Sequence, residues 1–97
     1  METELRGIVE KHLDLFLKEE NLSLRAENYR KFQELGLVKS LDDALFGALF
    51  ECLALIIASI KVPMGLTMTD VEIEELYNII KNRSLEINSK ISQTTNL

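Results

Sequence analysis

Residues 44–60 read ALFGALFECLALIIASI, and this apolar stretch decides the fold. Fourteen of its seventeen residues are apolar, and Glu51 is the one that carries a charge. A membrane-spanning helix needs roughly 20 apolar residues, and a carboxylate at mid-membrane is costly, so we expect no membrane span here. The stretch instead indicates a helix over 41–61 that is buried inside a small protein.

The predicted helix is apolar around most of its circumference. At about 100° per residue its small and polar side chains fall within an arc of about 80°. These side chains are Ser40, Asp43, Gly47, Glu51, Ala54, Ala58 and Lys61. An ordinary surface helix has an apolar stripe roughly 100° wide, and the apolar arc here is more than twice as wide. In a bundle each helix keeps an outward side, so we expect a second copy of the chain to cover part of this helix. The residues expected at that interface are Leu45, Phe46, Leu49, Leu53, Ile56 and Ile60.

Three further segments repeat apolar residues at the three- and four-residue spacing of helices. The expected helices cover approximately residues 3–19, 24–35, 41–61 and 70–90. Thr69 and Glu72 match a capping box at the start of the last helix, and Ser40 is a good N-cap for the helix over 41–61. The sequence therefore predicts an all-α fold, a small bundle of about four helices in which the third is most buried. We expect residues 1–91 to form a single domain and residues 92–97 to be a frayed polar tail.

The composition limits how such a bundle can be stabilised. A chain of 97 residues buries a smaller share of its surface than a larger protein does. Cys52 is the only cysteine, which excludes an intrachain disulfide and suits a reducing compartment. One cysteine and one histidine do not make a four-ligand zinc site, so we expect neither metal nor cofactor. Oligomerisation is the remaining means of stabilisation.

The charge pattern bears on partners and location. The net charge is −5, from 16 acidic and 11 basic residues. This balance argues against a protein that coats nucleic acid broadly, because such binding needs a basic face. The N-terminal segment METELRGIVEKHLDLF is charged and amphipathic and lacks the apolar core of a signal peptide. We therefore expect a cytoplasmic protein.

Three residues could carry chemistry, and each has a simpler structural interpretation. Glu51 has no carboxylate or histidine three or four residues away, so we interpret it as a solvated residue of the polar arc. His12 lies in the apolar face of the first segment, where a packed, hydrogen-bonded residue is the simpler alternative to a pH-sensitive switch. Cys52 lies among apolar residues and is interpreted as inert packing. No phosphate loop, nucleophile elbow or zinc-protease motif occurs, so we expect that the protein is not an enzyme.

A second interpretation starts from residues 21–49, NLSLRAENYRKFQELGLVKSLDDALFGAL. Leu22–Arg25 alternates apolar and polar residues, and a short helix, a glycine-containing turn and a capped helix follow. This order resembles the ribbon-helix-helix transcription factors and antitoxins, in which paired arms enter the major groove. The resemblance implies a DNA-binding regulator. Its DNA contacts would be Ser23, Arg25, Lys39 and Ser40.

The wide apolar arc of 41–61 and the acidic balance of the chain favour the first interpretation. We expect a non-enzymatic helical protein-interaction or structural module that self-associates as a homodimer. Its partner would be a second copy of itself, or another protein, with no membrane involved. Nucleic acid is a partner only under the second interpretation.

Overall fold

The computed structural model describes residues 1–96, and these residues are helical almost throughout. The elements in chain order are α1 (Thr3–Phe16), α2 (Glu19–Glu34), α3 (Leu41–Lys61), the 3₁₀ turn η1 (Val62–Met64), α4 (Asp70–Asn82) and α5 (Ser84–Thr95). No strand occurs in this part of the chain. The predicted all-α class is confirmed, with five α-helices among the described residues where about four were expected.

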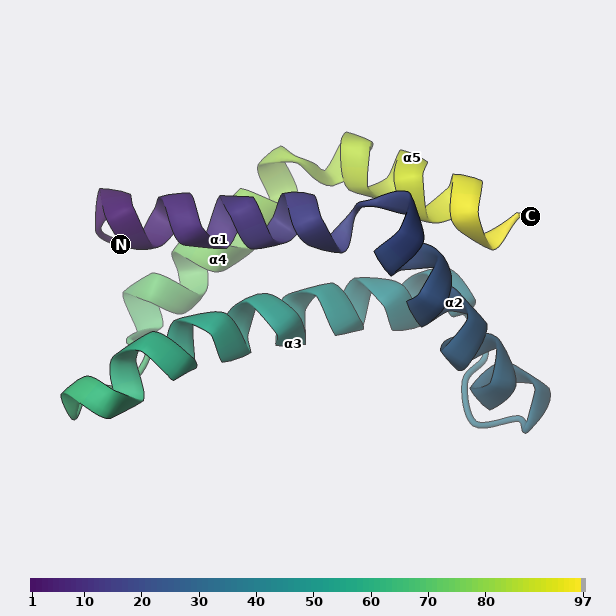
Figure 1. Ribbon diagram of the computed structural model, residues 1–97, viewed down its shortest axis with the longest axis horizontal. Coiled ribbons are helices and arrows are strands. Elements are labelled where there is room, and N and C mark those ends of the chain that lie inside the picture. The colour runs from purple at the N-terminus through teal and green to yellow at the C-terminus, as the bar shows by residue number, and fades with distance from the viewer. Residues whose placement is uncertain (97) are drawn as a thin grey trace.

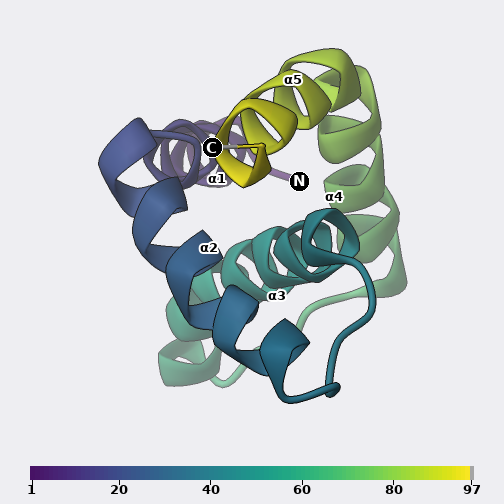
Figure 2. The same cartoon turned by 90° about the vertical axis from the view of Figure 1, so that its right-hand side faces the viewer.

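The helix α3 is the central element and contacts α1, α2, α4 and α5. In Figure 1 it runs along the lower edge of the molecule, with α1 and α5 above it and α2 crossing at one end. Seen along its length in Figure 2, α3 has α2 on one side and α4 on the other. The neighbours of α3 therefore cover only part of its circumference.

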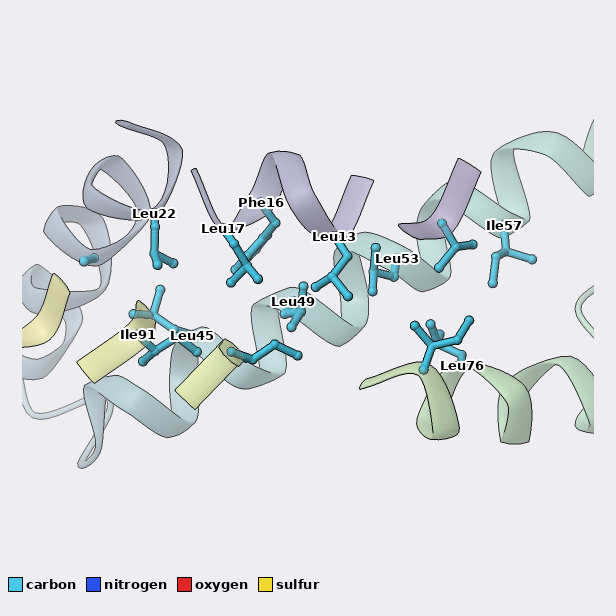
Figure 3. Packing of buried hydrophobic residues seen from close by; sticks show 14 of the residues in the cluster. Leu13, Phe16, Leu17, Leu22, Leu45, Leu49, Leu53, Ile57, Leu76 and Ile91 are labelled. Carbon is cyan, nitrogen blue, oxygen red and sulfur yellow. The ribbon is translucent and has the colours of Figure 1, made fainter. Parts of the chain in front are cut away.

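The core is built on one ridge of α3, formed by residues four positions apart. Its members are Leu41, Leu45, Leu49, Leu53 and Ile57, and all are buried. Figure 3 shows this ridge facing Leu13 and Phe16 of α1, Leu76 of α4 and Ile91 of α5. With these five residues α3 supplies more buried side chains than any other described helix.

The first bend of the chain differs from the prediction. The helix α1 ends at Phe16 rather than at residue 19, and Lys18 is extended, with a ψ of 138°. Glu19 and Glu20 then form the first turn of α2, where negative charge favours a helix N-terminus. The helix α2 therefore begins at Glu19 instead of near residue 24, and Leu22–Arg25 are helical.

The last predicted helix, 70–90, is divided at Arg83. Arg83 leaves helical geometry, with φ −107° and ψ 15°, and its guanidinium donates a 2.5 Å hydrogen bond to Asp14 of α1. A straight continuation of α4 would carry the following residues past the core. The bend instead returns Ile87 and Ile91 to the core, where both are buried.

The expected frayed tail, residues 92–97, is helical as far as Thr95. Thr94 is buried. Arg30 of α2 donates hydrogen bonds to the backbone oxygens of Thr94 and Thr95, at 3.1 and 3.2 Å. These bonds satisfy carbonyls that a helix C-terminus otherwise leaves unpaired, so the last helix is held against α2. Leu97 lies outside the described residues.

Both predicted N-terminal caps are confirmed. The Ser40 hydroxyl accepts a hydrogen bond of 3.1 Å from the N–H of Asp43 at the start of α3. Thr69 and Glu72 form a reciprocal capping box at the start of α4. These local interactions explain why α3 and α4 begin where the sequence predicts.

Candidate interaction surface

Burial divides α3 into four ridges of residues spaced four positions apart. Opposite the buried ridge, the residues Asp43, Gly47, Glu51, Leu55 and Ser59 are exposed. Two flanks separate the buried ridge from the exposed ridge. One flank holds the half-buried residues Ala44, Ala48, Cys52, Ile56 and Ile60. The other flank holds the half-buried residues Asp42, Phe46, Phe50, Ala54 and Ala58. The exposed ridge and the flank that contains Cys52 are together termed the open side of α3.

The other flank of α3 borders α4. The ring of Phe50 stacks on Tyr77 of α4, with ring centroids 5.1 Å apart and planes 11° from parallel. Lys61, at the end of α3, forms an ion pair with Glu72 of α4. The open side includes Leu55, which lies outside the predicted polar arc.

The helix α2 borders the open side and forms with it an open groove of about 820 Å³. Arg25 and Tyr29 of α2 line one wall, and residues of the open side together with Phe50 line the other. A smaller depression beside this groove is lined in part by His12 and Leu24, and it shares Arg25 and Cys52 with the groove. The two hollows therefore form one continuous and largely apolar surface across α1, α2 and α3.

Arg25 and Glu51 are the charged residues of the groove. The Arg25 guanidinium lies 4.7 Å from the centroid of the Phe16 ring, a cation–π contact. Glu51 is exposed. Within the described part of the chain neither residue takes part in an ion pair. The groove thus presents one unpaired charge of each sign beside apolar surface.

The six residues expected at an interface separate into two groups. The first group, Leu45, Leu49 and Leu53, has no exposed surface. The expectation is corrected for these three, because they form the ridge enclosed by the other helices and are not accessible to a second chain. The second group, Phe46, Ile56 and Ile60, is half-buried. Of these, Ile56 lines the groove.

Sequence reasoning did not identify Leu55, Arg25 and Tyr29 as parts of this surface. A helical projection places Leu55 in the apolar arc but does not show which part of that arc the neighbouring helices cover. Arg25 and Tyr29 are four residues apart, a spacing that puts both on one face of α2. Nothing in the sequence shows that this face borders α3.

The residues assigned to DNA under the second interpretation do not form an arm. They are Ser23, Arg25, Lys39 and Ser40. The first two lie in the second turn of α2, and the last two lie in the segment before α3. Leu22 and Ala26 are both buried, and their four-residue spacing anchors this turn of the helix to the core. The extended arm of the ribbon-helix-helix interpretation is therefore wrong.

The residues considered for chemistry have ordinary surroundings. Glu51 lies in solvent on the open side, as predicted. The His12 ring donates from Nδ1 to the backbone oxygen of Ile8 at 2.8 Å. Cys52 is half-buried and lines the groove, rather than being enclosed in the core. Residues 1–96 contain no group of three or more histidine, cysteine or acidic side chains placed to hold a metal ion.

By length and composition the segment Leu41–Met64 could also cross a membrane. In an apolar 18-residue window of this segment 22% of the residues are buried, and most of the other residues of α3 are half-buried. The exposed residues of α3 are those of the ridge that contains Leu55. No protein-family model, curated protein or solved structure matches the chain.

Proposed function

We propose that this protein is a non-enzymatic helical interaction module that forms a homodimer through the open side of α3. The observation that carries the proposal is the uneven burial of α3. The ridge that includes Leu49 is fully enclosed, whereas Leu55 on the opposite side is 65% exposed. Each large apolar side chain left in water forgoes roughly 1.5–3 kcal/mol of burial free energy. This is a large loss against a total stability of roughly 5–15 kcal/mol, so it favours a partner on the open side.

The chain exposes more surface than a compact protein of its mass. The accessible surface of the chain is 6410 Å². A compact protein of 11.1 kDa is expected to expose about 5,650 Å². The larger value agrees with the elongated shape of the chain, 41 × 25 × 21 Å, and leaves surface available to a partner. The radius of gyration is 14.3 Å, against about 12.5 Å for a compact domain of this length. Since two-fold dimers are the commonest oligomers, a second copy is the simplest partner.

Two leucine substitutions test the proposal. Leu55→Arg places a charge on the open side, whereas Leu85→Arg places the same charge on α5 at a leucine that is 87% exposed. We expect the unmodified chain and Leu85→Arg to have the mass of a dimer, and Leu55→Arg to have the mass of a monomer. Light scattering after size-exclusion chromatography measures the masses. Circular dichroism shows whether each variant keeps its helices.

Two results would contradict the proposal. If folded Leu55→Arg keeps the mass of a dimer, the open side of α3 is not the interface. If the unmodified chain is a monomer that binds phosphatidylcholine vesicles, the open side faces lipid instead of a second copy.

A further inference from the structure

The open side of α3 changes in character along its length. Its N-terminal half carries the small residues Ala44, Gly47 and Ala48. Its C-terminal half carries the large residues Leu55, Ile56 and Ile60. Cys52 lies between the two halves. A Cβ added at Gly47 would meet no atom within 4 Å, so the space directly over Gly47 is unfilled by the chain itself.

This division makes the surface complementary to itself in one orientation. In a two-fold dimer the same patch is used twice, so that residue i meets residue j and residue j meets residue i. If two copies of α3 were parallel, large residues would meet large ones and small residues would face each other across a gap. If they are antiparallel, Leu55 and Ile56 of each copy lie over Gly47 and Ala48 of the other. Close packing of large against small favours the antiparallel arrangement.

The charges of the groove suit the same arrangement. Glu51 and Cys52 lie at about the middle of α3, and Arg25 of α2 lines the same groove. A two-fold axis beside Cys52 brings Arg25 of one copy toward Glu51 of the partner subunit, and the reverse pair forms as well. Each groove would then contain an interchain ion pair next to apolar contacts. Without these pairs, the two copies of Glu51 would be close to each other near the axis, which is unfavourable.

We propose that two copies of this chain pack antiparallel in the groove between α2 and α3, with the two-fold axis beside Cys52 and reciprocal Arg25–Glu51 pairs. This inference rests on the proposed dimer and specifies its geometry. It predicts which residues of the two chains are in contact. Those contacts can be tested separately from dimerisation itself.

Charge reversal tests the reciprocal pairs. In the homodimer of Arg25→Glu, or in that of Glu51→Arg, both pairs carry like charges, and we expect the Kd to rise about tenfold or more. When the two variants are mixed, both pairs again carry opposite charges, so a heterodimer with a Kd near that of the unmodified dimer should form. Sedimentation velocity with one variant fluorescently labelled measures both quantities. An intrachain pair would not favour the heterodimer, because mixing leaves each chain unchanged.

Single cysteines test the antiparallel orientation. In a Cys52→Ser background, Ala48→Cys and Leu55→Cys each supply the only thiol of their chain. Antiparallel packing predicts that a short bismaleimide joins Ala48→Cys to Leu55→Cys in a mixture, with little cross-linking of either variant to itself. Strong self-cross-linking of both variants would show a parallel dimer and overturn the inference.

A dimer that neither prefers the charge-reversed heterodimer nor cross-links in the mixture would also overturn the inference but leave the proposed function standing. A monomeric unmodified chain would remove both.

Discussion

Glu72, at the start of α4, is the residue whose titration the structure changes most clearly. Its carboxylate accepts hydrogen bonds from the Lys61 ammonium, from the N–H of Thr69 at 2.9 Å and from the Thr69 hydroxyl at 3.1 Å. The bond from Lys61, followed by that from the Thr69 N–H, lowers the pKa of Glu72 from 4.5 to about 2, although burial opposes the change. One side chain therefore caps α4 and ties it to the end of α3.

The lowered pKa of Glu72 sets the direction of a pH effect on stability. Because the folded-state pKa lies below the unfolded-state value, the contribution of Glu72 is complete above about pH 4.5 and is lost as the pH falls toward 2. We expect Glu72→Gln to lower the free energy of unfolding at neutral pH by on the order of 2–3 kcal/mol, and to have little effect near pH 2. Urea denaturation across this pH range measures the difference.

A neighbouring carboxylate supplies the control for this measurement. Glu74 lies in the same helix and is exposed. We expect Glu74→Gln to keep the pH profile of the unmodified chain. If Glu72→Gln loses stability below pH 4.5 as steeply as the unmodified chain does, the role given to Glu72 is wrong.

At the scale of the helical element, two glycines allow the open side of α3 to be compared with an ordinary helix surface. Gly7 lies in α1 and Gly47 lies in α3. Both are exposed, and a Cβ added at either would meet no atom within 4 Å. In a lone chain the two positions should respond alike to substitution. In the proposed dimer, the space over Gly47 is filled by the partner subunit.

Matched lysine substitutions at the two glycines test this difference. We expect Gly7→Lys and Gly47→Lys each to stabilise the monomeric fold by about 0.5–1 kcal/mol, because lysine is a better helix former than glycine. Only Gly47→Lys should weaken the dimer, since its side chain occupies the space predicted for Leu55 of the partner subunit. Urea denaturation of dilute protein measures the first effect, and the native mass of each variant measures the second. Equal dimer dissociation for the two variants would contradict the assignment of the open side.

At the scale of the whole molecule, the helices could be predicted where neighbouring residues specify them. The caps at Ser40 and Thr69 are local, and they correctly predict where α3 and α4 begin. The break between the first two helices was predicted at residues 20–23 but lies earlier, at Lys18, and the bend at Arg83 was not predicted. The bend at Arg83 is held by Asp14, which is distant in sequence, and its benefit is the burial of apolar residues that only the assembled core provides.

The candidate surface could be predicted only in part for the same reason. The excess of apolar residues in α3 is visible in the sequence, and from it we expected a second copy to cover part of this helix. Which ridge stays exposed depends on where the neighbouring helices pack, including the stacking of Phe50 on Tyr77 of α4. Such contacts join residues from different helices, so helical periodicity did not reveal them. The expectation therefore included Leu49, which is buried, and omitted Leu55, which is exposed.

Sedimentation equilibrium of the unmodified chain in detergent-free buffer shows whether a second copy covers the open side of α3. At micromolar concentration we expect the mass of two chains of 11.1 kDa each, and on dilution a mass that falls toward one chain. A mass of 11.1 kDa that does not change with concentration, in a sample that circular dichroism shows to be helical, would contradict this expectation.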